Sequence, residues 1–476
     1  MKYCPKCNSC VNDDARFCVR CGYNLKKHEE ENVEIFCPSC GTKFSGGVFC
    51  PSCGYNTSND IAQSNFDSGV LDKIDFSKMQ SDVEKQLTEE IKVRVQNDSD
   101  IINGILYKYH GNDSDIIIPE GVIEIGESAF AKCDKIATVV FPDTIKKIDS
   151  RAFFECKNIQ SIIIPSSVTE IGDCVFSSCI SLKSVRIPHS ITKLGIGIFS
   201  GCSSLESIYI PSSIKQIGPG AFSSCSSLKE IEIPRGVSVI SSSTFSSCKS
   251  LTSVTIPSTV RKIDSHAFRG CENLKSIALP SSVSEFGINA FHGCTGLESI
   301  SIPGPVKIIE ESLFEGCVKL KSFILPETVT TIESRAFYGC SSLETLNLPK
   351  SVGTGIELNV TAFWGCSNLN EITLRSGHAR LCSIDGCLYE RAGDKLYMLY
   401  YPEGKKNSSF EIAKNTIMIL GMVFRKSEHL CSLIINSELE RIANCAFEDC
   451  PNLTKIYIAK GRKYDNLPAG VEIIEY

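Results

Sequence analysis

The sequence predicts a solenoid of stacked, mainly β coils, preceded by two small cysteine-rich modules. Phenylalanines recur every 23 residues from Phe130 to Phe337. A fixed period of this length is typical of an array of repeats, each of them one supersecondary unit. Ahead of the array, residues 4–21 and 37–53 each hold two CxxC pairs. These two observations fix the fold class before any single residue is considered.

Composition narrows the classes of function. The chain of 476 residues is 42% hydrophobic and has a formal net charge of −6. The hydrophobic content is that of a protein with a core, and the charge argues against general affinity for nucleic acid or anionic membranes. No apolar run approaches the roughly 20 residues needed to cross a bilayer, and "MKYCPKCNSC" lacks the apolar centre of a secretory signal. We therefore expect no membrane span and a cytoplasmic location.

The cysteines fall into three groups. Of the 26 in the chain, nine lie in the first 53 residues and twelve recur once per repeat. Such a distribution favours a reducing compartment over a disulfide scaffold. The remaining five are Cys174, Cys382, Cys387, Cys431 and Cys445.

The first two modules have metal-ligand spacing. They read "CPKCNSCVNDDARFCVRC" and "CPSCGTKFSGGVFCPSC". Two thiolates three positions apart can chelate one ion from a single tight turn, and two such turns make a closed tetrahedral site of the structural zinc type. A redox CxxC occurs singly, so the paired copies favour metal. Cys10 has no place in this pattern, and we interpret it as a bystander.

About the first 56 residues resemble tandem bacterial zinc ribbons, the first at 1–26 and the second at 34–56. The resemblance implies two structural zinc ions and no catalysis at the metal. The implied ligands are Cys4, Cys7, Cys18 and Cys21, then Cys37, Cys40, Cys50 and Cys53. Zinc ribbons can also bind nucleic acid, but residues 1–56 carry seven Lys or Arg against six Asp or Glu, so no basic face is expected. A structural or docking module is the favoured interpretation.

Residues 57–90 separate the modules from the array. Residues 57–75 are rich in Ser, Asn, Asp and Gln and predict a flexible linker. Phe76, Met79, Val83 and Leu87 then recur at helical spacing, which predicts a short amphipathic helix. Its polar face is acidic rather than basic, so packing on the next domain is favoured over a membrane surface.

The repeat unit reads C-x-x-L-x-x-I-x-I-P-x-x-V-x-x-I-x-x-x-A-F. The I-x-I segment alternates like a short strand, and the proline ends it because it has no N–H for the next hydrogen bond. V-x-x-I forms a second apolar side, often followed by a glycine such as Gly172 or Gly287 that allows a turn. The Ala-Phe pair brings an aromatic ring inward, and the cysteine acts as a small buried hydrophobe. One coil cannot bury its own core, whereas stacked coils can.

A period of 23 and the core L-x-x-I-x-I, as in Leu205, Ile208 and Ile210, match leucine-rich repeats. The usual Asn or Cys after the strand is replaced by Pro. With the AFxxC pattern, this resembles the BspA-like leucine-rich repeats of bacterial and protist surface proteins, over residues of about 100 to 460. The resemblance implies a right-handed coil with short parallel strands, used for protein binding. It also makes the cell surface the alternative to the cytoplasm.

The array restarts once. "INGILYK" at 102–108 returns as "IDGCLYE" at 384–390. We therefore divide the array into a first block at 91–374, a hairpin insertion at 375–410, and a second block with a cap at 411–476. Four tyrosines gather in the insertion, where an exposed cluster would indicate a ligand surface, but packing on the solenoid is favoured. They are Tyr389, Tyr397, Tyr400 and Tyr401.

The middle residue of I-x-I is expected to point outward and form a stripe along the sheet face. The stripe reads Ile117, Val140, Ile163, Arg186, Tyr209, Glu232, Thr255, Ala278, Ser301, Ile324, Asn347 and Thr373. Its apolar start is either a contact patch or, as we favour, covered by residues 76–109. Arg186, Tyr209 and Glu232 are the candidate partner site, because Tyr and Arg are enriched in interface hot spots. For any one of them, a solvated sheet face is the simpler interpretation.

No catalytic constellation is visible. The seven histidines do not share a repeat position, and no nucleophile stands in a recognisable setting. Alternating charges such as Lys183, Glu206 and Lys229 are interpreted as register and solubility pairs. We expect a non-enzymatic scaffold that binds a protein of unknown identity, with oligomeric state open. The alternative is a nucleic-acid-associated factor whose ribbons bind DNA or RNA.

Overall fold

The computed structural model describes residues 94–353, 359–375 and 377–476, together with four short strands nearer the start. Two compact units divide between Asp75 and Phe76. In the first unit, β1 pairs antiparallel with β2, and β3 pairs antiparallel with β4. The four strands are β1 (Lys2–Tyr3), β2 (Cys10–Val11), β3 (Ile35–Phe36) and β4 (Lys43–Phe44). The predicted linker and helix at 57–90 lie outside the described residues.

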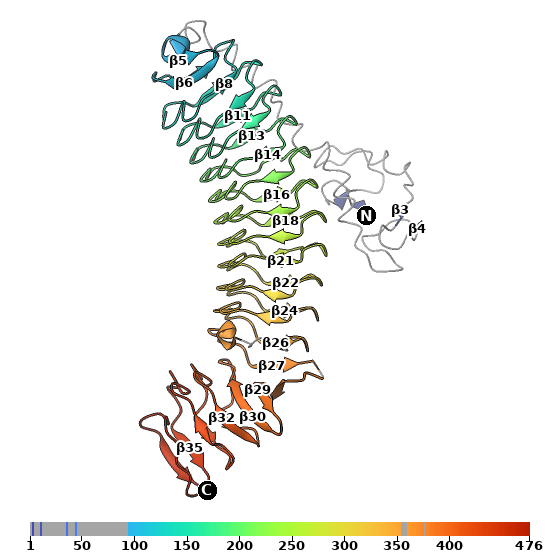
Figure 1. Ribbon diagram of the computed structural model, residues 1–476, viewed down its shortest axis with the longest axis vertical. Helices are drawn as coiled ribbons and strands as arrows, with labels where there is room; N and C mark the ends of the chain where they lie inside the picture. The colour runs from blue at the N-terminus through green and yellow to red at the C-terminus, as the bar shows by residue number, and fades with distance from the viewer. Residues whose placement is uncertain are drawn as a thin grey trace. The chain divides into compact units, whose positions relative to one another are not determined.

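The second unit begins with a hairpin of β5 (Ser99–Ile102) and β6 (Ile105–Tyr109). Asn103 and Gly104 make its turn with φ of 52° and 78°, a conformation that these two residue types tolerate best. Strand β6 also pairs in parallel with β8 (Glu124–Ile125), a strand of the first coil. The hairpin therefore closes one end of the coil stack (Figure 1).

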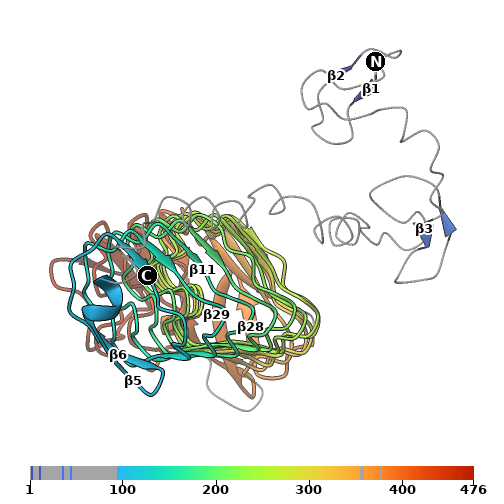
Figure 2. The same ribbon diagram turned by 90° about the horizontal axis from the view of Figure 1, so that it is seen from above.

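Successive coils stack in parallel, with about 15 turns in the described chain. Viewed close to the stacking direction, they overlie one another (Figure 2). In the coil of Tyr209, residues 207–210 form no strand. The other I-x-I segments form the first column of strands. They are β7 (Asp115–Ile117), β9 (Thr138–Val140), β11 (Ser161–Ile163), β13 (Ser184–Arg186), β16 (Glu230–Glu232), β18 (Ser253–Thr255), β20 (Ser276–Ile277), β22 (Ser299–Ser301), β24 (Ser322–Ile324), β26 (Thr345–Leu348) and β27 (Glu371–Leu374).

The V-x-x-I segments form a second column. Its strands are β8 (Glu124–Ile125), β10 (Lys147–Ile148), β12 (Glu170–Ile171), β14 (Lys193–Leu194), β15 (Gln216–Ile217), β17 (Val239–Ile240), β19 (Lys262–Ile263), β21 (Glu285–Phe286), β23 (Ile308–Ile309) and β25 (Thr331–Ile332). In both columns the strands fall into several short parallel sheets, and wherever two strands pair, each residue faces its equivalent one repeat later, as in Ile162 with Val185 and Ile148 with Ile171. The repeat length of the sequence is therefore the register of the sheets.

The repeat phenylalanines form one internal ladder. From Phe130 to Phe363 each ring stacks on the next, with ring centroids 5.0 to 6.2 Å apart. Their side chains are fully buried, as are the repeat leucines from Leu182 to Leu369 and the repeat cysteines from Cys156 to Cys366. The core thus lies between coils rather than within any one of them, as expected for a solenoid.

The repeat cysteines do more than fill space. Cys248 Sγ lies 3.1 Å from the backbone carbonyl of Phe222, and its thiol donates a hydrogen bond to that oxygen. The same bond recurs in ten successive coils from Cys156 to Cys366, at 3.0 to 3.3 Å. Each cysteine therefore links its own coil to the backbone carbonyl of the ladder phenylalanine in the preceding coil.

The glycines after the V-x-x-I strands are needed for close approach rather than for a left-handed turn. A Cβ at Gly172 would lie 2.4 Å from the backbone nitrogen of Ser150 in the preceding coil, and one at Gly287 would lie 2.2 Å from that of Ser265. Neither glycine has a positive φ. At these two positions a side chain would force the backbones apart, whereas other coils carry Asp149, Asp264 or Glu310 at the same place in the repeat.

Near the end of the first block, a short 3₁₀ helix, η2 (Val360–Phe363), precedes β27, and an antiparallel meander follows. Strand β30 of the meander also pairs in parallel with β32, so the second block continues the stack. The meander strands are β28 (Leu381–Ile384), β29 (Cys387–Ala392) and β30 (Lys395–Tyr400). The second block holds β31 (Ser409–Glu411), β32 (Thr416–Ile419), β33 (Ser432–Ile434), β34 (Arg441–Ile442), β35 (Lys455–Ile458) and β36 (Glu472–Glu475).

Two adjacent tyrosines join the two blocks. The Tyr400 ring packs edge-on against Phe363, and its hydroxyl donates to the Phe363 carbonyl at 3.1 Å. The Tyr401 ring lies 5.2 Å from Phe424, the first phenylalanine of the second ladder. Tyr389 is also fully buried. Packing on the solenoid is thus the role of these three tyrosines, as favoured above, whereas Tyr397 is half-buried.

Candidate functional site

The sheet-face stripe is exposed over most of its length. Arg186 and Glu232 are exposed, and Tyr209 is 44% exposed. The following members are exposed as far as Asn347, including Ile324 at 67%. All of these side chains alternate with buried neighbours, because successive residues of a strand point to opposite faces.

The apolar start of the stripe is buried. Ile117 and Val140 are only 8% and 7% exposed, and Ile163 is half-buried. These residues therefore offer little free surface. The proposed cover by residues 76–109 stays a prediction, since residues 76–93 lie outside the described part of the chain.

Arg186, Tyr209 and Glu232 come from three consecutive coils. Arg186 pairs in register with Ile163 of the coil before it, and Glu232 with Thr255 of the coil after it. Stacked coils lie about 4.8 Å apart, so the backbones of Arg186 and Glu232, two coils apart, are roughly 10 Å apart, with the coil of Tyr209 between them. The three side chains can therefore contact one partner together.

Glu206 and Lys229, two of the alternating charges predicted to pair between neighbouring coils, form an ion pair. Lys229 Nζ lies 2.6 Å from Glu206 Oε2, and this contact lowers the pKa of the Glu206 carboxyl. Both side chains are more than 60% exposed, so the pair contributes little to stability. Glu206 and Lys229 stand three residues before Tyr209 and Glu232 in their coils, so the pair places one charge of each sign beside the candidate surface.

The cysteines predicted to bind zinc lie outside the described residues, although short strands near them are described. Strand β1 ends immediately before Cys4, and its partner β2 begins three residues after Cys7. Strands β3 and β4 stand in the same relation to Cys37 and Cys40. In the sequence, each first CxxC therefore falls between two strands that pair with each other.

The described cysteines of the solenoid behave as core residues rather than as reactive groups. In the described part of the chain, no group of three His, Cys, Asp or Glu side chains could hold a metal ion. Burial raises the pKa of the Cys202, Cys248 and Cys340 thiols to about 12. The thiolate is the reactive form, so these residues are not nucleophiles at neutral pH. Among the described residues, no helix has the length and apolarity to cross a membrane.

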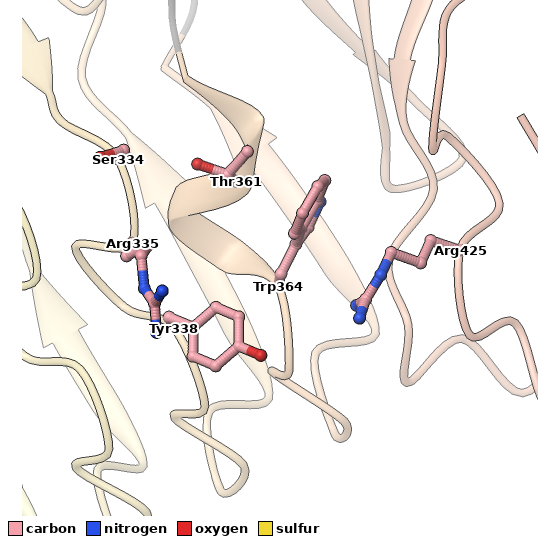
Figure 3. Close-up of a pocket in the computed structure, with 6 residues that line it drawn as sticks. All are labelled: Ser334, Arg335, Tyr338, Thr361, Trp364 and Arg425. Carbon is pink, nitrogen blue, oxygen red and sulfur yellow. The ribbon is translucent and has the colours of Figure 1, made fainter. Parts of the chain in front are cut away.

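A further pocket was not predicted from the sequence. It has a volume of about 320 Å³ and lies where the last coils of the first block meet the second block (Figure 3). Its described lining residues are Ser334, Arg335, Tyr338, Thr361, Trp364 and Arg425. The signal that could have revealed it is the residue after each ladder phenylalanine, which is tyrosine and then tryptophan in these coils.

Two family models match the chain. The model of the BspA type leucine rich repeat region matches residues 100–229, 146–275, 197–317, 285–385 and 399–467. The model of the double zinc ribbon matches residues 4–54. A search of the curated proteins finds no match.

Three solved structures of leucine-rich repeat proteins are similar to this chain. A leucine-rich repeat protein from Bacteroides ovatus is 26% identical, with a TM-score of 0.62 over 78% of this chain and 94% of that one. The leucine-rich repeat protein of T. pallidum is 28% identical, over 40% of this chain and 82% of its own, with a TM-score of 0.33. A leucine rich cell surface protein from Faecalibacterium prausnitzii is 24% identical, over 78% and 80%, also with a TM-score of 0.33.

Proposed function

This chain belongs to the BspA-type leucine-rich repeat family, and we propose that it binds a protein partner through Arg186, Tyr209 and Glu232 on the sheet face of its solenoid. The single observation that carries the proposal is the exposed stripe itself. Eight exposed positions from Arg186 to Asn347 follow one another on adjacent coils. They span roughly 34 Å, about the diameter of a small domain.

The composition of the stripe supports a protein rather than a nucleic acid as partner. Arg186 and Glu232 present opposite charges on either side of the Tyr209 ring. Tyrosine and arginine dominate interface hot spots, whereas nucleic-acid surfaces concentrate positive charge. Leucine-rich repeat proteins are usually non-enzymatic, and a scaffold of this kind needs only a rigid, exposed surface.

The amino-terminal modules complete the proposal. We place zinc ribbons at 1–26 and 34–56, with one structural ion in each, held by Cys4, Cys7, Cys18 and Cys21 and by Cys37, Cys40, Cys50 and Cys53. A linker at 57–90 would tether them to the blocks at 91–374 and 411–476, with the insertion at 375–410 between. The match to the double zinc ribbon family supports this assignment. Nearly balanced charge in residues 1–56 leaves the nucleic-acid alternative without a supporting observation.

We place the protein in the cytoplasm. All seventeen described cysteines, from Cys133 to Cys450, carry free thiols, which fits a reducing compartment. The cell surface is the alternative, because relatives in this family are often surface proteins. Labelling of intact cells with an impermeant biotin reagent separates the two locations: strong labelling would move the protein to the surface.

Affinity capture tests the partner site. The full chain would be immobilised, and bound proteins identified by mass spectrometry, in parallel with Arg186→Ala and Tyr209→Ala. We expect the same partner to be lost or reduced about ten-fold or more in both variants, since hot-spot truncations typically cost at least 1 to 2 kcal/mol. Tyr107→Ala is the matched control, because Tyr107 is a tyrosine of similar exposure, at 50%, on the end hairpin. A partner that both variants retain would rule out this face.

A further inference from the structure

The residue directly after the ladder phenylalanine changes from serine to a large side chain between the coils of Phe245 and Phe268. Directly after the ladder phenylalanine, four successive coils carry serine: Ser177, Ser200, Ser223 and Ser246. The next five coils carry large side chains: Arg269, His292, Glu315, Tyr338 and Trp364. The phenylalanines stack alike in both regions, at 5.8 Å for Phe176–Phe199 and 5.6 Å for Phe291–Phe314. Folding of the coil therefore does not require a large residue here.

The last two of these side chains line the pocket of about 320 Å³. A guanidinium lies against each ring, with Arg335 Cζ 4.6 Å from the centroid of Tyr338 and Arg425 Cζ 4.8 Å from that of Trp364. Figure 3 shows the four side chains in the order Arg335, Tyr338, Trp364, Arg425. Two aromatic rings and two cations thus form one surface from three coils.

Each of the two guanidinium groups donates a hydrogen bond to a glutamate carboxylate of the protein. Arg335 Nε donates to Glu315 Oε2 at 3.0 Å, and Arg425 Nη1 donates to Glu403 Oε1 at 3.2 Å. The Glu403 side chain is only 3% exposed and also accepts the Gly365 N–H at 3.0 Å. Fixed cations of this kind need no reordering when a ligand arrives, which favours binding.

The Trp364 indole nitrogen is a buried donor without an acceptor in the described part of the chain. Buried polar groups without a partner are rare in native proteins because each costs free energy. The other polar groups of the described lining are guanidinium groups and hydroxyls, and none is a carboxylate. None of these described lining groups accepts from the indole N–H, so a ligand can supply the acceptor.

These features select against a cationic ligand. Aromatic cages bind cations through open ring faces. Here each ring already has a guanidinium against it, and further positive charge would be repelled. A neutral apolar ligand would leave the indole N–H unpaired, whereas a carboxylate can accept from both the indole and a guanidinium, in short charge-assisted bonds.

We propose that this pocket binds a glutamate or aspartate side chain of an acidic peptide segment. The carboxylate accepts from Trp364 Nε1–H and Arg425, and the methylene stem lies against the two rings. The volume is at the small end of ligand pockets, as suits one side chain rather than a cofactor. This site is separate from the sheet-face stripe and does not depend on the function proposed for it.

The chain has one tryptophan, so its fluorescence reports on the pocket directly. The full-length protein would be titrated with a blocked hexapeptide carrying two central glutamates, and with the same peptide carrying glutamines. We expect a saturable change in emission with the glutamate peptide, and binding about ten-fold or more weaker with the glutamine peptide. Equal affinity for both peptides, or no saturation with glutamate up to about 10 mM, would overturn the proposal.

Two variants locate the binding. Tyr338→Ser installs the residue of the serine coils, so the coil should still fold, and it leaves the Trp364 reporter in place. Trp364→Phe keeps an aromatic ring but removes the indole N–H, and its binding is measured by polarisation of a fluorescein-labelled glutamate peptide. We expect each to bind about ten-fold more weakly, with Trp364→Phe also losing most of its preference for glutamate over glutamine.

Tyr209→Ser is the matched control, because it removes an exposed tyrosine from the sheet face instead. It should bind the glutamate peptide as the unaltered protein does, with an unchanged circular dichroism spectrum. Wild-type affinity in a folded Tyr338→Ser, or an equal loss in Tyr209→Ser, would show that the pocket is not the site. Tighter binding of a proline-rich hexapeptide than of the glutamate peptide would also overturn it.

Discussion

Removing one ring from the middle of the phenylalanine ladder should destabilise the solenoid strongly. Phe245 is fully buried between Phe222 and Phe268, whose centroids lie 5.7 and 5.4 Å from its own. Truncation to alanine therefore opens a cavity and removes two stacked contacts. Phe→Ala substitutions in cores cost about 3 to 5 kcal/mol, and we expect Phe245→Ala in the upper half of that range.

The end of the second ladder provides the comparison. Phe447 is 8% exposed, and in the described chain its one stacked neighbour is Phe424, at 5.3 Å. Phe447→Ala should therefore cost less, because stability in a solenoid sums coil and nearest-neighbour terms. Arg186→Ala, on the outer face, should change stability by less than about 0.5 kcal/mol.

Unfolding by guanidinium chloride, followed by circular dichroism, measures all three variants. Comparison of midpoints and slopes shows whether each transition remains cooperative, since long arrays can depart from two-state behaviour. If Arg186→Ala were as damaging as Phe245→Ala, the assignment of inner and outer positions would be wrong. The sheet-face partner site would then lose its basis.

Three further predictions concern the cysteines. Elemental analysis should find about two zinc ions per chain, and Cys18→Ser should lose one of them without changing the circular dichroism of the solenoid; retention of both would remove Cys18 from the ligand set. Ser427 occupies the cysteine position of its coil, is 1% exposed, and has a hydroxyl without a partner among the described residues. Ser427→Cys should therefore raise the free energy of unfolding by about 1 kcal/mol. A loss of stability would contradict the role given to the thiol bond. Brief alkylation of the native protein, mapped by mass spectrometry, should modify the exposed Cys431 and Cys445 but not Cys248, and early modification of Cys248 would show that the ladder thiols are accessible.

Periodicity revealed most of the fold. A spacing of 23 residues sets the strand columns, the ladder of rings and the side on which each residue of I-x-I lies, because every coil sees the same neighbours. Ile324, an isoleucine at an outward position, is indeed 67% exposed despite its hydrophobicity. Position in the repeat thus outweighs residue type.

What the repeat pattern could not show was contact between positions. The thiol of Cys248 reaches a carbonyl 26 residues earlier, and nothing in a consensus indicates that a small buried residue is a donor. The pocket at Tyr338 and Trp364 also depends on Arg425, which is 61 residues beyond the tryptophan and on the far side of an insertion. Proximity of that kind follows from how the meander rejoins the stack, which is a property of three-dimensional packing.

Because the coils share one register, the array can be lengthened or shortened by whole repeats. Wherever adjacent strands pair, they do so with the same offset of one repeat, and the same thiol bond joins successive coils from Cys156 to Cys366, so coils of the regular region offer compatible faces. Deletion of residues 203–225 would join Cys202 to Ser226 and bring the strand of Arg186 next to that of Glu232. The binding stripe would shorten by one strand spacing, about 4.8 Å, with both ends intact. Gene-level gain or loss of one 23-residue unit is therefore a route by which such a protein can change the reach and order of its surface residues without redesigning its core.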